Sequence, residues 1–588
     1  MLYLRSTKLI TKSLAAPVWL SLRRPLSSPR SSSTVATPTR PPCRAFSFMA
    51  HPPIYDDNLF IYTTGNWLVN DELRHAERRR DFDVAGLSQL AAKSVGRSPD
   101  DILRLEKLAE GGFNRTFLIT MHDGFRMVAR IPYPVTTPKY FAVASEVATL
   151  DRLRSAGLPV PDVYGYSPTP DNAARTEHIF MAFVEGINLD AIWYELEEKD
   201  IISISRQIAE LEAKMMSIPF PAGGSLYFPE DLANAPGSVS GITLEDKRFC
   251  VGPDTHPHLW CGRRSELDVN RGPYESAGAA LKSGPEKEVT FLRRFGRPLL
   301  PFQRARRDVY QYREQLPSHH IENLDLFSSI APSLIPNDPT LVRFCMRHPD
   351  LQPSNIIVSW PRDANSYVVN SLIDWQHTSV LPLFLQAGIP HELQNHGDIV
   401  SRFMARPSLP DNFDNLDETE QREEREHYRR RLVHYHYVDK TEKYNKLHSA
   451  ALMDPAGVLR RRLFYHARSP WRGESLELKL ALIRATEKWE TLTGSGGSPC
   501  PIVFDPDEVR KTSELETELE KSDELLEKCR DLIGVGPEDW MPAERYKAAL
   551  AISQQLKVDA LAATESAKER AEIEAHWPFD DRNEDDYM

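Results

Sequence analysis

The sequence predicts an α+β protein with a small β-rich lobe, a large helical lobe and a helical C-terminal extension. Short apolar strand patterns gather between residues 95 and 187, whereas helix-period patterns dominate residues 188–493 and 500–588. A Gly/Ser-rich linker separates the last two ranges. At 588 residues the chain is too long for one compact core, which indicates two or three domains. Its 41% apolar and 27% charged content is typical of a globular protein.

Residues 1–46 differ in composition from the rest of the chain. They are rich in Arg, Lys, Ser and Pro and contain no Asp or Glu. Their leucines can line one face of a basic helix, which is the profile of a mitochondrial presequence, with cleavage expected near Phe46. A basic tail without a targeting role is the alternative interpretation.

Net charge, hydropathy and cysteine content bear on nucleic-acid binding, membrane insertion and redox compartment. The net charge is −12 and becomes more negative without the basic segment, so nucleic acid is not an expected partner. No run approaches the ~18 apolar residues of a membrane span, so no transmembrane segment is expected. Six cysteines in so long a chain fit a reducing compartment.

Residues 47–94 are predicted to form a preface packed on the small lobe, and residues 95–187 to form a nucleotide-binding lobe. Gly111 and Gly112 lie at a hairpin tip, where backbone N–H groups can approach a phosphate without an intervening Cβ, although such a tip can also be a plain turn. Arg130 lies in a Val-Ala-Arg-Ile strand. It is either a nucleotide contact or a solvated charge at a strand end.

The stretch 344–375 carries the clearest chemical pattern. His348, Asp350 and Asn355 follow the spacing H-x-D-x-x-x-x-N, and a strand, a turn and a second strand then lead to Asp374. A hairpin of this kind brings Asn355 and Asp374 together. Phosphoryl transfer needs such groups, because the protein's work is positioning and charge neutralisation. Asp350 would accept the proton of the attacking hydroxyl, and Asn355 with Asp374 would hold Mg²⁺. A turn with a capping acid is the alternative.

This stretch resembles the aminoglycoside phosphotransferase family, a kinase-like group that also contains choline and homoserine kinases. The match covers His348-Pro349-Asp350-Leu351, Asn355 and Ile373-Asp374-Trp375. The resemblance implies a two-lobed protein-kinase-like fold and transfer of the γ-phosphoryl group of ATP, with Mg²⁺, to a hydroxyl of an unknown small molecule. It also implies that His348 braces the catalytic loop. The segments 62–67 and 382–390 resemble the fungal mitochondrial "altered inheritance of mitochondria" branch of this family.

Arg130 is the main departure from the kinase pattern, in which a lysine at this position contacts the α- and β-phosphates. Arginine keeps the charge but presents a planar fork, so the exchange is not neutral. Glu146, on the helix predicted over 142–156, is its expected partner, matching the strand–helix ion pair of kinase-like folds. In kinases the backbone near 182–184 would meet adenine. The arginine and the short glycine loop leave open a nucleotide-binding pseudokinase or scaffold in mitochondrial maintenance.

A protein kinase is disfavoured, because no Ala-Pro-Glu and no phosphorylatable activation segment follow Asp374. Within the large catalytic lobe, residues 222–340 are predicted to contain an insert, whose part 249–274 would lie beside the acceptor pocket. Zinc is disfavoured there, because the spacings lack paired ligand motifs. The residues that raise the question of zinc are Cys250, His256, His258 and Cys261.

Two long amphipathic helices are predicted in the C-terminal extension, over 513–533 and 543–573. They either pack on the large lobe, which is the favoured interpretation, or offer a surface to a protein partner.

Overall fold

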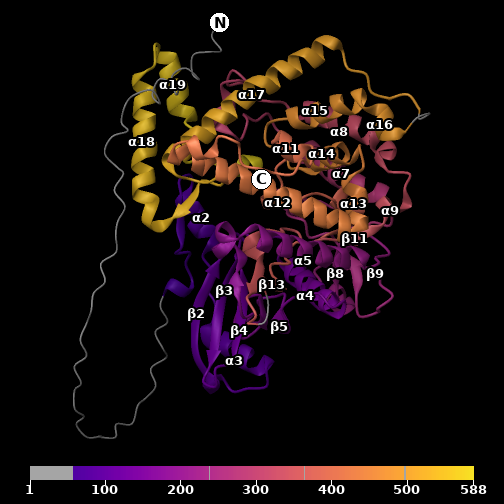
Figure 1. Cartoon of the computed structure of the whole chain (residues 1–588), viewed down its shortest axis with the longest axis vertical. Helices are drawn as coiled ribbons and strands as arrows, with labels where there is room; N and C mark the ends of the chain where they lie inside the picture. Colours follow the sequence, from indigo (N-terminus) through magenta and orange to yellow (C-terminus); the bar gives the residue numbers. More distant parts are fainter. Residues whose placement is uncertain (1–56, 238, 363–364, 495–497) are drawn as a thin grey trace.

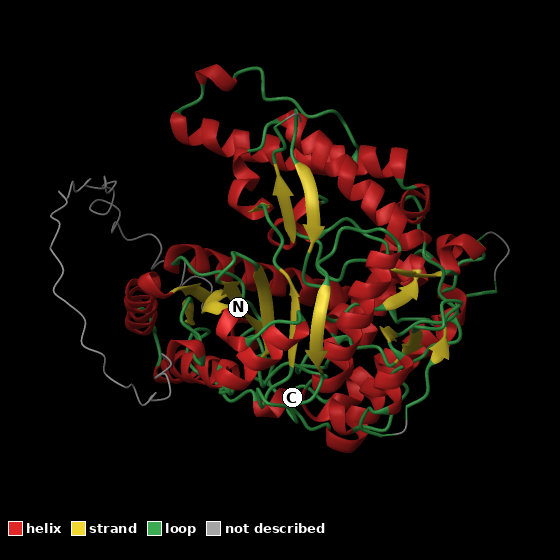
Figure 2. Ribbon diagram, turned by 90° about the horizontal axis from the view of Figure 1, so that it is seen from below, coloured by secondary structure: helices red, strands yellow, loops and turns green. Residues whose placement is uncertain are grey.

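The computed structural model describes residues 57–237, 239–362, 365–494 and 498–588. The predicted presequence and its cleavage near Phe46 lie outside the described residues. The strands of the small lobe gather at one end of the molecule and the helices of the large lobe at the other (Figure 1). Seen from below, helices flank the strands on both sides (Figure 2). The predicted α+β, two-lobed fold is confirmed.

A five-stranded antiparallel sheet in the order β2-β3-β4-β6-β5 forms the small lobe. Strand periodicity places Phe117 and Ala129 in a core with Leu87 of α3, whereas Val128 faces Val143 of α4. The sheet is therefore covered on both faces. Its strands and helices are β2 (Ile102–Glu110), β3 (Asn114–Met121), β4 (Arg126–Pro132), β5 (Val163–Ser167), β6 (His178–Ala182), α3 (Val84–Ser94) and α4 (Lys139–Ser155).

The segment that leaves the small lobe pairs directly with the predicted catalytic hairpin. Strands β7 (Ile187–Asn188), β12 (Ile356–Ser359) and β13 (Val368–Leu372) form a sheet in the order β13-β12-β7. Gly186 has φ +149°, and a Cβ there would lie 2.6 Å from the carbonyl oxygen of Val358, so only glycine fits this close approach. The connection between the lobes is thus anchored beside the site.

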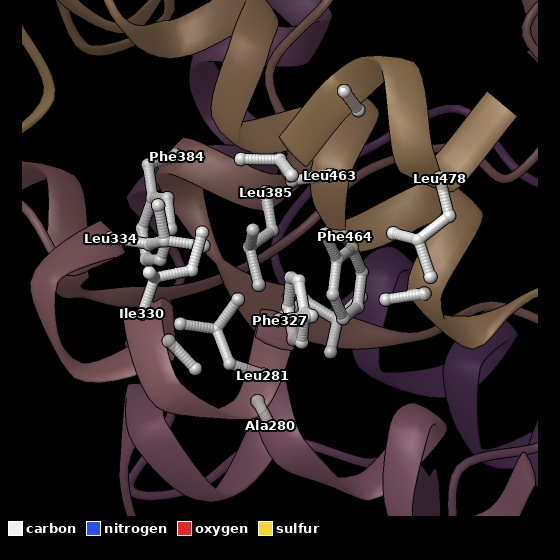
Figure 3. Close-up of a cluster of buried hydrophobic side chains, with 14 of the residues drawn as sticks. Ala280, Leu281, Phe327, Ile330, Leu334, Phe384, Leu385, Leu463, Phe464 and Leu478 are labelled. Atoms are coloured by element: carbon white, nitrogen blue, oxygen red, sulfur yellow. The ribbon is translucent and has the colours of Figure 1, made fainter. Parts of the chain in front are cut away.

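The large lobe is built around one extensive apolar core. Figure 3 shows Leu281 of α7, Phe327 of α8, Leu385 of α10 and Leu463 of α14 pointing into it. Helices α7 and α8 lie within the range predicted to contain an insert, yet they are central to this core. The α-helices are α5 (Glu198–Ser217), α6 (Pro229–Ala233), α7 (Ala277–Phe295), α8 (Pro317–Ile330), α9 (Pro339–Val342), α10 (Leu383–Gln386), α11 (Ile399–Arg402), α12 (Glu418–Tyr444), α13 (Lys446–Leu452), α14 (Gly457–Arg468), α15 (Leu476–Glu487) and α16 (Trp489–Thr493).

Two small sheets accompany these helices. They pair β8 (Ser225–Tyr227), β10 (Cys250–Gly252) and β9 (Ile242–Thr243) in that order, and β11 (Phe344–Met346) with β14 (Val380–Pro382). The strand β11 leads directly into the H-x-D pattern, and its pairing with β14 fixes the position from which the catalytic loop starts.

The C-terminal extension packs on the large lobe and also pairs with the first strand of the described chain. Its elements are α17 (Pro506–Ile533), β15 (Trp540–Pro542), α18 (Tyr546–Ala562) and α19 (Ala567–His576). Strand β15 pairs antiparallel with β1 (Gly65–Trp67), which precedes α2 (Asp71–Arg78). Leu519 of α17 packs against Leu480 of α15. The helix predicted over 543–573 is two helices, because Ser566 caps the second by accepting a hydrogen bond from the N–H of Glu569.

Within the described ranges, no helix combines the length and the apolar character needed to cross a membrane.

A fully buried charge cluster fixes the segment before α7 to the large lobe. Glu288 accepts hydrogen bonds from Arg264 at 2.8 and 2.6 Å and from Lys287 at 2.8 Å, and all three side chains are 0% exposed. The N–H of Trp471 donates to the same carboxylate at 2.7 Å. Burial acts to raise the pKa of Glu288, but the charges of Lys287 and Arg264 outweigh it and hold that pKa well below its ordinary value.

We expect Glu288→Gln to lower the free energy of unfolding by about 3–5 kcal/mol, because two buried cations lose their counter-charge. Urea unfolding of the full chain at pH 7 measures this, with the exposed Glu286→Gln as control. Since the pKa of Glu288 is depressed, its contribution is present above its ordinary pKa and declines as the pH falls toward the lowered value. The gap between wild type and Glu288→Gln should therefore narrow in acid; a constant gap would contradict this account.

Candidate active site

The hairpin of β12 and β13 brings its two ends together as the sequence predicts. The N–H of Ile373 donates a 3.0 Å hydrogen bond to the carbonyl oxygen of Asn355, so the residue that enters the hairpin is tied to the residue that leaves it. Asp374 follows with φ +65°. A non-glycine residue in the left-handed region is strained, and such strain concentrates at functional sites.

His348 connects the catalytic loop to the end of this hairpin. Its Nε2–H donates to the carbonyl oxygen of Ile373 at 2.9 Å, and its Nδ1 accepts from the N–H of Asp350 at 3.1 Å. The ring is buried and lies 4.4 Å from the ring of Trp375. Burial lowers the pKa of His348 to about 4, so the ring is neutral and fixed in one tautomer at pH 7. The geometry is that of a brace.

Asp350 is exposed at the end of this brace. The side-chain amide of Gln352 donates to Oδ2 of Asp350 at 2.5 Å. Nδ2 of Asn355 donates to the backbone carbonyl oxygen of Asp350 at 2.8 Å and to Oδ2 of Asp350 at 3.2 Å. Desolvation, followed by the negative charge of Asp374, raises the pKa of Asp350. These contacts orient a carboxylate with increased proton affinity toward solvent.

Asn355 and Asp374 each present an oxygen that no described residue uses. Because Nδ2 of Asn355 is bonded to Asp350, its Oδ1 is the free end of the amide, and it accepts no hydrogen bond within the described ranges. Oδ2 of Asp374 is likewise without a donor there, whereas Oδ1 pairs with Arg130. Carboxylate and amide oxygens are the ligands that Mg²⁺ prefers, so this donor set fits a hard cation.

Arg130 is buried between two carboxylates. Its guanidinium contacts Glu146 of α4 at 2.8 Å and Asp374 at 2.5 Å. Burial raises the pKa of Glu146 to about 7 despite the opposing charge of Arg130. Burial acts in the same direction on Asp374, but Arg130 outweighs it and the pKa of Asp374 is lowered. The predicted Arg130–Glu146 pair is present, and Arg130 additionally reaches across to the large lobe.

Gly111 and Gly112 form the turn between β2 and β3. A Cβ at Gly111 would meet only the carbonyl oxygen of Asn114 at 3.6 Å, and one at Gly112 would meet no atom within 4 Å. The described protein therefore leaves open space beside both glycines. That space belongs to the cavity that the catalytic loop also lines.

One cavity of about 880 Å³ collects most of the predicted site. Arg130 and Glu146 lie behind Asp374 and do not line it. The predicted residues that do line it are Gly111, Gly112, His348, Asp350, Asn355 and Asp374. The backbone near 182–184 is not part of its lining either, and the N–H of Ala182 already donates to the carbonyl oxygen of Asp162 at 2.8 Å.

Of the four residues that raise the question of zinc, His256 and His258 are in contact, with their ring centroids 4.8 Å apart. Cys250 is buried in β10, and only His256 of the four lines the cavity, together with Pro257. Across the described ranges, no group of three or more His, Cys, Asp or Glu side chains is arranged to hold a metal ion.

Sequence reasoning missed several polar residues of the cavity. Gln376 lies 2.7 Å from the side-chain amide of Asn114 and accepts from Arg130 at 3.3 Å. His377 has φ +62° and packs its ring 5.2 Å from that of Phe113 at the glycine turn. Two arginines of α14 also line the cavity; their spacing of seven residues puts them on one helical face, but no local pattern connects that helix to the catalytic loop.

The chain is similar to several known proteins. Residues 104–384 match the model of the phosphotransferase enzyme family. A subtelomeric hrmA-associated cluster protein of Aspergillus fumigatus is 30% identical over 522 residues, covering 82% of this chain and 97% of that protein. Altered inheritance of mitochondria protein 9 of Clavispora lusitaniae is 28% identical over 379 residues, covering 56% of this chain and 61% of that protein.

Solved structures of phosphotransferases overlap with a large part of the chain. The ternary complex of streptomycin, ATP and APH(2″)-IIa has a TM-score of 0.32 and 12% identity, covering 70% of this chain and 99% of that one. The family model and the similarity to the Aspergillus relative show that this chain belongs to the phosphotransferase enzyme family.

Proposed function

We propose that this protein is a mitochondrial phosphotransferase that moves the γ-phosphoryl group of ATP, in the presence of Mg²⁺, to a hydroxyl of a small molecule. The observation that supports it most directly is the convergence of Asp350, Asn355 and Asp374 on one cavity, together with the glycine turn. An exposed carboxylate with a raised pKa beside two free oxygen ligands is the arrangement that phosphoryl transfer to an alcohol requires.

Each group has a distinct role in this proposal. Asp350 accepts the proton of the acceptor hydroxyl, and its hydrogen bonds to Gln352 and Asn355 hold it in place. The turn at Gly111 and Gly112 gives the phosphates access to backbone N–H groups. A Mg²⁺ ion held by Asn355 and Asp374 would supply neutralising charge to those phosphates.

A mitochondrial location is supported by two independent features. The curated relatives of Clavispora lusitaniae and Yarrowia lipolytica carry the designation mitochondrial in their names. The first 46 residues of this chain have the composition of a presequence, rich in Arg and Ser and free of acidic residues.

A nucleotide-binding pseudokinase or scaffold is the second candidate function, and one contact favours it. Arg130 occupies Oδ1 of Asp374 at 2.5 Å, so one oxygen of the proposed metal ligand is already engaged. A scaffold would also need a partner protein, for which the C-terminal helices, with the exposed Val558 on α18, would be the surface. The two candidates differ in turnover, which the following variants measure.

Asp350→Asn should reduce phosphoryl transfer by roughly 10²–10⁴-fold, because the variant keeps the shape of the side chain but cannot accept a proton. ATP consumption by the full chain, supplied with a mitochondrial metabolite extract, measures this. The exposed Asp411→Asn is the matched control. Tight ATP binding with no turnover that depends on Asp350 would favour the scaffold.

Glu146→Gln should weaken ATP binding by about tenfold, equivalent to about 1.4 kcal/mol, because Arg130 loses the 2.8 Å ion pair that positions it beside Asp374. Calorimetric titration with a non-hydrolysable ATP analogue measures the affinity, and a cooperative thermal transition verifies that the variant is folded. The exposed Glu210→Gln is the control. Equal affinity in Glu146→Gln and wild type would remove this pair from the proposed site.

Chelation of divalent cations should abolish turnover, and added MgCl₂ should restore it. In Asp374→Asn the half-saturating Mg²⁺ concentration should rise about tenfold or more, because the metal loses an ionised ligand. Initial rates measured across a Mg²⁺ titration check this at saturating ATP. An unchanged Mg²⁺ requirement would mean that the metal is held elsewhere.

A further inference from the structure

The helix α14 presents a basic face to the same cavity. Arg461 and Arg468 are each three or four residues from Phe464 and Tyr465, which is the spacing of one helical face, and all four line the cavity. None of them belongs to the H-x-D pattern or the hairpin. The cavity therefore has a second polar wall whose role the phosphoryl-transfer groups do not explain.

Arg461 has no described carboxylate in contact with it, because the nearby Asp454 pairs with Arg460 instead. Among the residues that the structure describes, no carboxylate lies within 4.0 Å of its guanidinium, and its buried Nη1 has no hydrogen-bond partner. Burial, followed by the like charge of Arg347, lowers the pKa of Arg461 to about 10, so it is still a cation at pH 7. Arg461 is half-buried, and a partly desolvated charge without a paired carboxylate is costly, which is unexpected unless a ligand supplies an anion.

Its neighbours do not supply that anion. Arg347 is fully engaged by Glu212 at 2.6 Å, and the nearest carboxylate to Arg468 is that of Asp254 at 3.7 Å. Burial raises the pKa of Asp254, which weakens it as a counter-charge. Three guanidinium groups thus line the cavity. The carboxylates that line it are Asp350 and Asp374, both used by the proposed chemistry, and Glu538 from the turn before β15.

A second polar group in the cavity, Nε2 of His377, has no hydrogen-bond partner in the described chain and could accept a hydrogen bond from a hydroxyl. His377 is 9% exposed, and its Nδ1–H donates to the carbonyl oxygen of Thr255 at 2.9 Å. That bond leaves Nε2 as an acceptor, and Nε2 is buried without a partner in the described chain. The cavity therefore offers an O–H acceptor near the catalytic loop and an unpaired cation on α14.

We propose that the acceptor is an anionic alcohol, a small molecule with a hydroxyl and a carboxylate or phosphate group, and that Arg461, assisted by Arg468, binds the anionic group. This rests on the proposed function. The acceptor hydroxyl gives its proton to Asp350, its oxygen forms the new bond to the γ-phosphorus, and the bond from that phosphorus to ADP breaks, with the electron pair leaving on ADP. A cationic alcohol would meet like charges at α14 instead.

Anion binding can be measured without any turnover. The full chain, saturated with Mg²⁺ and a non-hydrolysable ATP analogue to block the nucleotide site, is titrated calorimetrically with inorganic phosphate and with glycerate. We expect Arg461→Met to weaken binding of at least one of these anions by about tenfold or more, and Arg461→Lys to retain most of it. Arg462→Met, one residue further and paired with Glu477 at 3.2 Å, is the control and should match wild type.

Equal binding of both anions by wild type and Arg461→Met, or no binding by wild type, would overturn the inference. A thermal transition recorded for each variant separates loss of the site from loss of the fold. Preferential binding of phosphate identifies a phosphate-bearing acceptor, and preferential binding of glycerate identifies a carboxylate.

A transfer assay separates the inference from the proposed function. Labelled ATP is offered with four acceptors of similar skeleton, namely glycerate, glycerol 3-phosphate, glycerol and the amino alcohol serinol. We expect an anionic acceptor to be used best, with a higher KM in Arg461→Met. Better use of glycerol or serinol, dependent on Asp350, would overturn the inference and leave the proposed function intact. Anion binding that needs Arg461 without any turnover that needs Asp350 would overturn the proposed function alone.

Discussion

The guanidinium of Arg130 holds the two lobes together at the site. It lies on a central strand of the small lobe, and its two contacts reach Glu146 in the same lobe and Asp374 at the exit of the hairpin in the large lobe. Burying a cation costs several kcal/mol, and two carboxylates at hydrogen-bonding distance offset that cost only while both lobes keep this arrangement. The left-handed backbone of Asp374 is consistent with this constraint, because surrounding contacts must hold a strained residue in place.

The two carboxylates that share the Arg130 cation have pKa values shifted in opposite directions. Burial dominates at Glu146, whose pKa rises to about 7, whereas the charge of Arg130 dominates at Asp374, whose side chain is 46% exposed and whose pKa falls. Asp374, which faces the cavity, therefore stays ionised at neutral pH. Glu146, behind Arg130, is the carboxylate that gains or loses a proton near pH 7. A carboxylate that is already ionised needs no proton release before it can bind a cation.

Local patterns made much of this site predictable. The H-x-D spacing, the hairpin and the Arg130–Glu146 pair each depend on neighbouring residues or on one strand and the next helix. Long-range features gave no such signal: nothing in the sequence indicates that β1 pairs with β15, or that α14 faces the catalytic loop. The range 222–340, predicted to contain an insert because it is rich in Gly, Pro and charge, contributes α7 and α8 to the core of the large lobe. Ser566, a helix cap, was overlooked inside an apparently continuous helix.

The buried charge cluster of the large lobe supports the cavity from behind. Lys287, which pairs with Glu288, also donates to the carbonyl oxygen of Arg468 at 3.1 Å, and a Cβ at Gly284 would lie 2.3 Å from the Cβ of Arg468. The end of α14 is therefore seated directly on α7. Because the same cluster binds Arg264, it also fixes the segment that follows His256, which lines the cavity. The basic face of α14 is thus held in place by a buried ion cluster whose members do not line the cavity, so residues away from a site can fix the side chains that face it.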